Sequence, residues 1–143
     1  MRKRTLARET ALKILYQAEL TRRKIDLAAE YYWAEIDSVD KQVRAYVDRL
    51  TNGITENLKI IDEKISQHAT NWQLKRMAVI DRNVMRIGAY ELLFAADIPP
   101  KVTINEAVEL AKKYGDLESS KFVNGILDRI HKTDISPQTG EKA

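Results

Sequence analysis

The stretch MAVIDRNVMRIGAYELLFAA, residues 77–96, decides the fold because a helix built from it is apolar on nearly every side. Its charged or amide side chains are few: Asp81, Arg82, Asn83, Arg86 and Glu91. A helix that is apolar all round is usually a buried, central one. We therefore expect a central helix here, with the remaining helices packed around it.

Arg86 and Glu91 stand inside this apolar stretch, and buried charges require partners. We interpret both as members of internal ion pairs rather than of a site. Glu106 and Glu109 belong to the next helix along the chain, so we expect one of them to pair with Arg86 across a helix–helix contact.

Turn and capping residues divide the chain on the carboxyl side of this helix. Pro99 and Pro100 cannot continue a helix, so we expect them to end it. Thr103 and Glu106 have the spacing of a capping box. The helix that they begin is expected to run to Tyr114, with Gly115 as its C-cap, before a last helix with an apolar stripe from Phe122 to Ile130.

Apolar residues at helical spacing also fill the amino-terminal half. The predicted helices there are residues 5–20 with Thr5 as N-cap, a short helix from Asp26 to Ile36, and a long one that starts at Asp37 and Ser38 and reaches Ile65, with Gly53 as a candidate break. No run alternates as a strand does. The sequence predicts an all-α protein.

The composition excludes several classes of function. The chain has 143 residues, no Cys, and no apolar run long enough to span a membrane, and we expect no signal peptide because no apolar segment follows the charged start. Without Cys there is no disulfide or thiol nucleophile, which suits a reducing cytoplasm. His68 and His131 stand alone, and Glu106 and Glu109 lack a companion catalytic motif. We therefore expect no catalytic residue, no metal and no cofactor.

Positive charge is concentrated at one end of the chain. The first eighteen residues hold five cations and one acid, a local charge of +4, so the other 125 residues carry −1 of the net +3. This asymmetry favours a localised contact with an anion, although a merely solubilising terminus has the same composition. The segment SSKFVNGILD also has two interpretations. Phe122 suits the core, but a helix start with Lys121 and an aromatic side chain can also hold a phosphate and stack a base.

Three segments, TLARETALKILYQAEL, MAVIDRNVMRIGAYELLF and DIPPKVTINEAVELAKKYGDLESSKFVNGILDRI, resemble in order and spacing the bacterial NusB transcription antitermination factors. The resemblance implies one all-α domain over residues 1–133, with about seven helices in two lobes, roughly 1–70 and 71–133. We expect residues 134–143 to be a disordered tail.

The resemblance also implies a function. NusB-like proteins bind boxA-type single-stranded RNA with the small-subunit ribosomal protein NusE, join the elongating RNA polymerase complex with other Nus factors, and support ribosomal RNA transcription. The resemblance does not decide whether the protein also forms a homodimer. The implied RNA contacts are Arg2, Lys3, Arg4, Arg8, Glu118, Ser119, Lys121 and Phe122, and the implied NusE contacts are Tyr16 and Asp81.

Two other functions fit parts of the sequence. One is a helical adaptor that binds proteins but no specific RNA. The other is an accessory to an RNA methyltransferase, since NusB-like domains also occur fused to such enzymes. Removing the first eight residues and titrating RNA would distinguish the adaptor from an RNA-binding factor.

Overall fold

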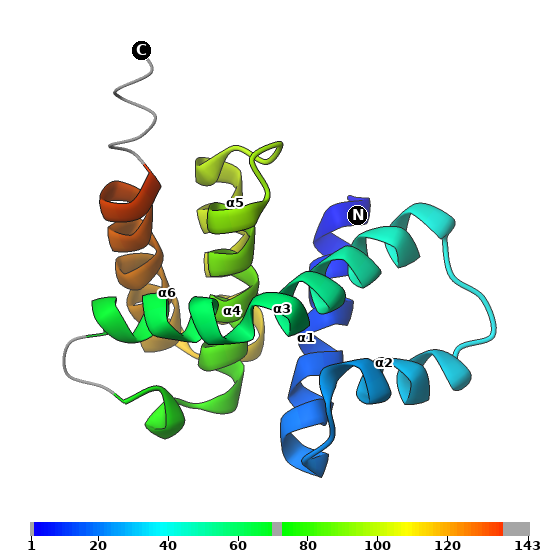
Figure 1. The fold of residues 1–143 in the computed structure, drawn as a ribbon. Helices are drawn as coiled ribbons and strands as arrows, with labels where there is room; N and C mark the ends of the chain where they lie inside the picture. The colour runs from blue at the N-terminus through cyan, green and yellow to red at the C-terminus, as the bar shows by residue number, and fades with distance from the viewer. Residues whose placement is uncertain (1, 70–72, 136–143) are drawn as a thin grey trace. The chain divides into compact units, whose positions relative to one another are not determined.

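The computed structural model describes residues 2–69 and 73–135, and this part of the chain is helical without strands (Figure 1). The all-α prediction is confirmed. The elements are α1 (Lys3–Thr21), α2 (Ile25–Ala34), α3 (Lys41–His68), the 3-10 turn η1 (Leu74–Arg76), α4 (Val79–Phe94), α5 (Pro100–Tyr114), α6 (Leu117–Ile130) and the π turn η2 (His131–Ile135). No helix in the described ranges combines the length and the apolar character needed to cross a membrane.

The chain forms two compact units, Met1–Asn57 and Leu58–Ala143, and α3 contributes its first part to one and its second part to the other. The boundary is a kink at Asn57, whose backbone is non-helical at φ −119° and ψ 18°. The side-chain amide of Asn57 donates to the Gly53 carbonyl at 2.8 Å. The candidate break at Gly53 therefore lies one turn before the observed one.

Helix α1 starts earlier than predicted and has no side-chain cap. It begins at Lys3, with Arg2 at the N-cap position, so the assignment of Thr5 as N-cap is wrong. Lys3 and Arg4 are good helix formers, so the helix can begin two residues before Thr5. One face of α1 is buried, including Ala7, Ala11, Ile14 and Leu15.

The next two helices also start at other residues than predicted. Helix α2 has Lys24 at its N-cap position, and Asp26 lies in its first turn. Asp40 rather than Asp37 or Ser38 caps α3, because its carboxylate accepts from the backbone N–H groups of Gln42 and Val43 at 2.8 and 3.2 Å.

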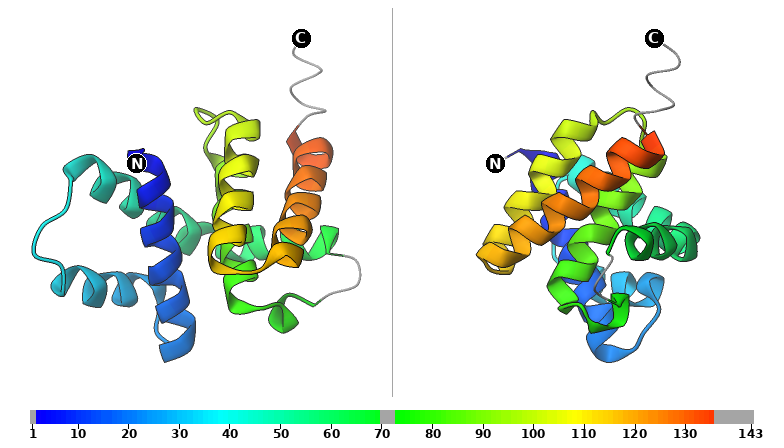
Figure 2. Two further views of the ribbon diagram at one scale, coloured as in Figure 1. Left: turned by 180° about the vertical axis from the view of Figure 1, so that it is seen from behind. Right: turned by 90° about the vertical axis from the view of Figure 1, so that its left-hand side faces the viewer.

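Helix α4 is the central helix of unit 2, as predicted. Figure 2 shows the hairpin of α5 and α6 beside it, and α4 packs against both of these helices. Val84, Met85 and Ala89 have no exposed surface. A Cβ on Gly88 would lie 2.6 Å from Leu127 Cδ1, so the glycine permits the close approach of α4 and α6.

The two arginines inside α4 bond to different neighbouring segments. Arg86 makes a two-pronged ion pair with Asp62 of α3, Nε to Oδ1 and Nη2 to Oδ2, both at 2.9 Å. The expected partners Glu106 and Glu109 are therefore wrong. Arg82 donates to the carbonyls of Leu74 and Met77 at 2.8 and 2.9 Å, which fixes the turn before α4.

Thr103 is buried inside α5 and donates to Glu91 Oε1 at 2.7 Å, so it does not form the predicted capping box with Glu106. The reason is that the prolines begin α5 instead of ending α4. Helix α4 ends at Phe94, and Pro100 occupies the first turn of α5, where a missing N–H costs nothing. The predicted end of α5 at Tyr114, with Gly115 as C-cap, is confirmed.

The end of the described chain is tied to unit 2. Asp134 lies 3.0 Å from Lys64 Nζ and 3.2 Å from His68 Nε2, and it belongs to η2. The described helical structure therefore extends to Ile135, into the segment expected to be a tail from residue 134. The rest of the predicted tail, residues 136–143, lies outside the described residues.

We expect Arg86→Met to lower the free energy of unfolding by about 2–4 kcal/mol. Loss of one partner of a fully buried pair costs about 3–5 kcal/mol, and the two side chains here keep 12% and 23% of their surface exposed. Denaturant titration measures the change. Lys132→Met, which removes a cation from the exposed pair with Asp128, is the matched control and should change stability by less than about 1 kcal/mol. Equal stability of Arg86→Met and the unmodified chain would contradict a structural role for the pair.

Candidate functional site

Four of the cations expected to contact RNA, Arg2, Lys3, Arg4 and Arg8, lie at the start of α1. Arg2, Lys3 and Arg4 are exposed, and the first turn of α1 contains no acidic residue. The positive end of the helix dipole disfavours cations here. The positive charge of Lys3 is partly compensated by residues at the start of α3. Its Nζ lies 3.1 Å from Asp40 Oδ2 and donates to Gln42 Oε1 at 2.7 Å. The hydrogen bond from Lys3 is the main reason that the pKa of Asp40 is lowered.

Arg4 and Arg8 are brought together by one aromatic ring. Their guanidinium carbons lie 4.7 and 5.6 Å from the ring centroid of Tyr46, a buried residue of α3. Arg4 is exposed, whereas Arg8 keeps only 3% of its surface exposed. The structure therefore separates the expected contacts into exposed cations and one cation held beneath them.

Three of the expected RNA contacts in unit 2, Glu118, Ser119 and Phe122, line one hollow of about 390 Å³. Asp81, an expected NusE contact, lines the same hollow. Arg76, Met77, Ala78 and Asp116 complete it. Lys121 is exposed and lies 3.7 Å from Glu118, outside the lining.

A capping box at the start of α6 fixes two residues that line this hollow. The Ser119 N–H donates to Asp116 Oδ1 at 2.8 Å, and the Asp116 N–H donates back to Ser119 Oγ at 3.3 Å. Ser119 is buried, so its hydroxyl fixes the start of α6. A Cβ on Gly115 would meet this hydroxyl at 2.7 Å, which explains the glycine at that position.

Two of the three carboxylates of the hollow, Asp81 and Asp116, have opposite electrostatic environments. Burial raises the pKa of the Asp81 carboxyl, a hydrogen bond from Ser119 opposes the rise, and the charge of Asp116 adds to it. Asp81 Oδ1 is buried without a hydrogen-bond partner. The hydrogen bonds of the capping box lower the pKa of Asp116 instead. The hollow therefore holds a buried carboxylate oxygen whose capacity to accept a hydrogen bond is unmet.

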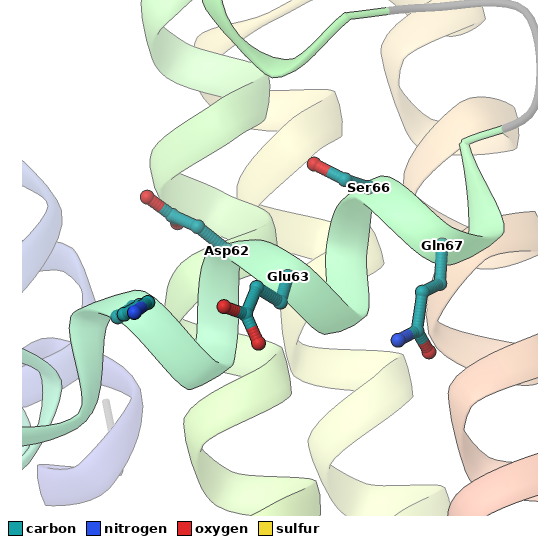
Figure 3. Close-up of a pocket in the computed structure, with 5 residues that line it drawn as sticks. Asp62, Glu63, Ser66 and Gln67 are labelled. Atoms are coloured by element: carbon teal, nitrogen blue, oxygen red, sulfur yellow. The ribbon is translucent and has the colours of Figure 1, made fainter.

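Other candidate sites have simpler explanations. Tyr16 is partly buried on α1 in unit 1, so the two expected NusE contacts belong to different units. A second hollow, lined by Lys59, Asp62, Glu63, Ser66 and Gln67, lies along the surface of α3 (Figure 3). Its Asp62 is already bonded to Arg86. Within residues 2–69 and 73–135, no group of three or more His, Cys, Asp or Glu side chains is placed to hold a metal.

Sequence reasoning missed Tyr46 and Asp116. Asp116 precedes Ser119 by three residues, so the capping-box spacing was available as a signal. Tyr46 lies three residues after Val43 of the apolar stripe, but a ring shared by two arginines on another helix leaves no trace in the sequence.

Comparison with known proteins assigns this arrangement to a family. A family model described as NusB family matches residues 5–132. The chain belongs to the NusB family. A related transcription antitermination protein NusB, from Desulfitobacterium hafniense, is 46% identical over 128 residues, which cover 89% of this chain and 86% of that protein. NusB from Pseudothermotoga lettingae is 42% identical over 135 residues, 93% of this chain and 94% of that one.

Solved NusB structures have the same fold. The T. maritima NusB structure matches with a TM-score of 0.84 and 44% identity, covering 93% of this chain and 92% of that one. A chain in a structure of the antitermination factors NusB and NusE in complex with dsRNA matches with a TM-score of 0.83 and 31% identity, covering 92% and 98%.

The opposite pKa shifts give this NusB-family chain a testable pH dependence. With a raised pKa in the folded state, Asp81 ionises first in the unfolded chain as pH rises past 3.8, so its charge destabilises the fold at pH 7. Asp81→Asn should therefore raise Tm at pH 7, and the gain should disappear at pH 3, where both states are protonated.

Asp116→Asn is the matched control with the opposite sign. Because the pKa of Asp116 is lowered in the folded state, its ionised carboxylate stabilises the fold above pH 3.8, and this stabilisation is lost as the pH falls. Replacing Asp116 by Asn should therefore lower Tm at pH 7. Calorimetry at both pH values measures each variant. A lower Tm for Asp81→Asn at pH 7 would contradict the electrostatic assignment.

Proposed function

We propose that this protein is a non-enzymatic transcription antitermination factor that binds boxA-type single-stranded RNA together with the ribosomal protein NusE. In this proposal the pair joins the elongating RNA polymerase complex in the cytoplasm and supports ribosomal RNA transcription. Family membership supports it, as does the likeness to the NusB chain in the complex of NusB and NusE with dsRNA. The observation that carries it is the set of exposed cations on a helix start that has no acid of its own.

RNA phosphate is the anion that fits this end of α1. Arg2, Lys3 and Arg4 are exposed, and guanidinium groups match phosphate with paired donors. Arg8 adds its charge from beneath, against the ring of Tyr46. These contacts position the backbone of the RNA and carry no sequence information.

The start of α6 supplies groups of another kind. Phe122 lines the hollow beside Asp81 and is only partly buried, so its ring can stack on an unpaired base. Glu118 is exposed and acidic, which suits a base or sugar donor rather than a phosphate. Ser119 holds the helix start, and the exposed Lys121 can reach a phosphate.

Tyr16 and Asp81 are the proposed NusE contacts. A partly buried tyrosine is a common anchor of a protein interface. Asp81 is only partly buried and lines the hollow, so a donor of the partner can approach its carboxylate there. This proposal needs no enzymatic activity, and an accessory role toward an RNA methyltransferase has no separate observation in its favour.

The salt dependence of RNA binding tests the proposal. If the exposed Arg2, Lys3 and Arg4 each neutralise one phosphate, log K should fall with log salt with a slope of about −2. Arg2→Gln with Arg4→Gln should flatten the slope by about 1.4 and weaken boxA-type and scrambled RNA alike. Phe122→Ala should instead cost about 1–3 kcal/mol of binding with the slope unchanged.

The control for the double variant is Lys112→Gln with Lys132→Gln, an equal charge change at two exposed residues of unit 2. It should leave the slope as it is. Thermal melts of every variant separate a loss of binding from a loss of folding. A slope that does not change in the Arg2 and Arg4 double variant would refute RNA binding at this end of α1, and a wild-type chain without RNA affinity would favour the adaptor function.

A further inference from the structure

Arg76 is the one cation among the described residues that line the hollow at the start of α6. Three other lining residues carry carboxylates, namely Asp81, Asp116 and Glu118. Arg76 is exposed, and in the part of the chain that the structure describes its guanidinium group forms no ion pair or hydrogen bond. The hollow therefore combines a majority of acidic groups with a single place where an anion meets a positive charge.

The backbone on both sides of Arg76 is held by a buried arginine of α4. Arg82 keeps 8% of its surface exposed and donates to the carbonyls of Leu74 and Met77 at 2.8 and 2.9 Å. The N–H of Arg76 itself donates to the Gln73 carbonyl at 2.9 Å. The backbone from which the Arg76 side chain extends is thus fixed before any ligand arrives, which reduces the entropy lost on binding.

The hollow has the size and the mixture of groups that suit one nucleotide. Its volume of about 390 Å³ lies in the usual range of small-molecule sites, about 300–1,000 Å³. The partly buried Phe122 and the buried Met77 give it an apolar surface beside the charged groups. A base can stack on an aromatic ring, a phosphate binds a guanidinium group through paired hydrogen bonds, and amino and hydroxyl donors bind carboxylates.

We infer that Arg76 is a further RNA contact, and that it binds the phosphate of the nucleotide whose base stacks on Phe122. This inference rests on the proposed function, which places RNA at the start of α6. The charges of the hollow decide the orientation of the nucleotide. A phosphate beside Asp116 or Glu118 would face a like charge, whereas at Arg76 it meets an opposite one.

The carboxylates of the hollow then face the donors of the nucleotide. The hydrogen bonds of the capping box lower the pKa of Asp116, so its carboxyl is ionised at neutral pH and accepts hydrogen bonds without donating any. Glu118 is exposed at the same hollow. Exocyclic amino groups and the ribose 2′-hydroxyl are the donors that a nucleotide presents. The acidic residues thus bind the sugar and base, and Arg76 binds the phosphate.

Lys75 provides the matched control for Arg76. It precedes Arg76 on the turn η1 and is exposed, but it is not among the residues that line the hollow. Lys75→Gln and Arg76→Gln make the same change in net charge at neighbouring positions. Long-range attraction of RNA should change alike in both variants, so a larger effect of Arg76→Gln reports a direct contact.

The first experiment titrates the full chain and its variants with boxA-type single-stranded RNA at several salt concentrations. Arg76→Gln should flatten the slope of log K against log salt by about 0.7 and weaken binding about fivefold at 0.1 M salt. Lys75→Gln should flatten the slope measurably less. Arg76→Lys keeps the charge and should retain the slope, but it should bind more weakly than the wild type because it lacks paired donors. Thermal melts verify that each variant is folded.

The second experiment locates the two contacts on the RNA. One phosphate at a time is replaced by a neutral methylphosphonate, and one base at a time is removed to leave an abasic site. One methylphosphonate position should weaken binding of the wild type but not of Arg76→Gln, and one abasic position should weaken binding of the wild type but not of Phe122→Ala. We expect the two positions to lie in the same nucleotide or in adjacent ones.

Equal flattening by Lys75→Gln and Arg76→Gln would overturn the inference, as would two positions further apart on the RNA. Unchanged RNA affinity of Arg76→Gln with weakened binding of NusE would also overturn it, because Arg76 would then contact a protein. If Phe122→Ala weakens RNA binding and Arg76→Gln does not, the inference fails and the proposed function survives. If neither variant affects RNA binding, the RNA contact at the start of α6 fails together with the inference.

Discussion

The polar groups inside α4 are the constraint on which unit 2 depends. A helix buried on nearly every side can hold charged residues only if neighbouring segments supply their partners. Arg86 requires Asp62 of α3, Arg82 requires the carbonyls of the turn before α4, and Glu91 requires Thr103 of α5. Each of these interactions fixes a different neighbour. They set the position of α3 and α5 against α4, and Gly88 completes the arrangement by admitting Leu127 of α6.

The surfaces proposed for binding follow from the same kind of constraint. The start of α6 is fixed by the capping box of Asp116 and Ser119, so Phe122 and Asp81 line one hollow. In unit 1 the ring of Tyr46 gathers arginines that would otherwise extend separately into water. In both units a buried or half-buried residue positions the side chains that are proposed to meet RNA or a protein partner. Binding groups of this kind are ordered before the ligand arrives, which reduces the entropy lost on binding.

Local patterns predicted the helices well and their tertiary partners poorly. The apolar stretch from Met77 to Phe94 predicted a central helix because hydrophobic periodicity reports burial directly. The partner of Arg86 could not be predicted, because Asp62 lies 24 residues earlier and only the packed fold brings it near. Thr103 had the spacing of a cap, but the helix begins one turn sooner, at the prolines. The hydroxyl of Thr103 donates instead to the buried Glu91. The charge asymmetry indicated a basic surface, and the buried position of Arg8 became visible only with Tyr46 in place.

The proposed function requires this chain and NusE to bind boxA-type RNA jointly. Calorimetric titration of boxA-type RNA into the protein alone, and into an equimolar mixture with NusE, tests it most directly, with a scrambled RNA of equal length as control. Joint binding predicts that NusE tightens the boxA complex by at least about fivefold, the lower end of typical coupling between sites. Joint binding also predicts that NusE raises the affinity for the scrambled RNA by a smaller factor. No measurable affinity for boxA-type RNA with or without NusE would contradict the account.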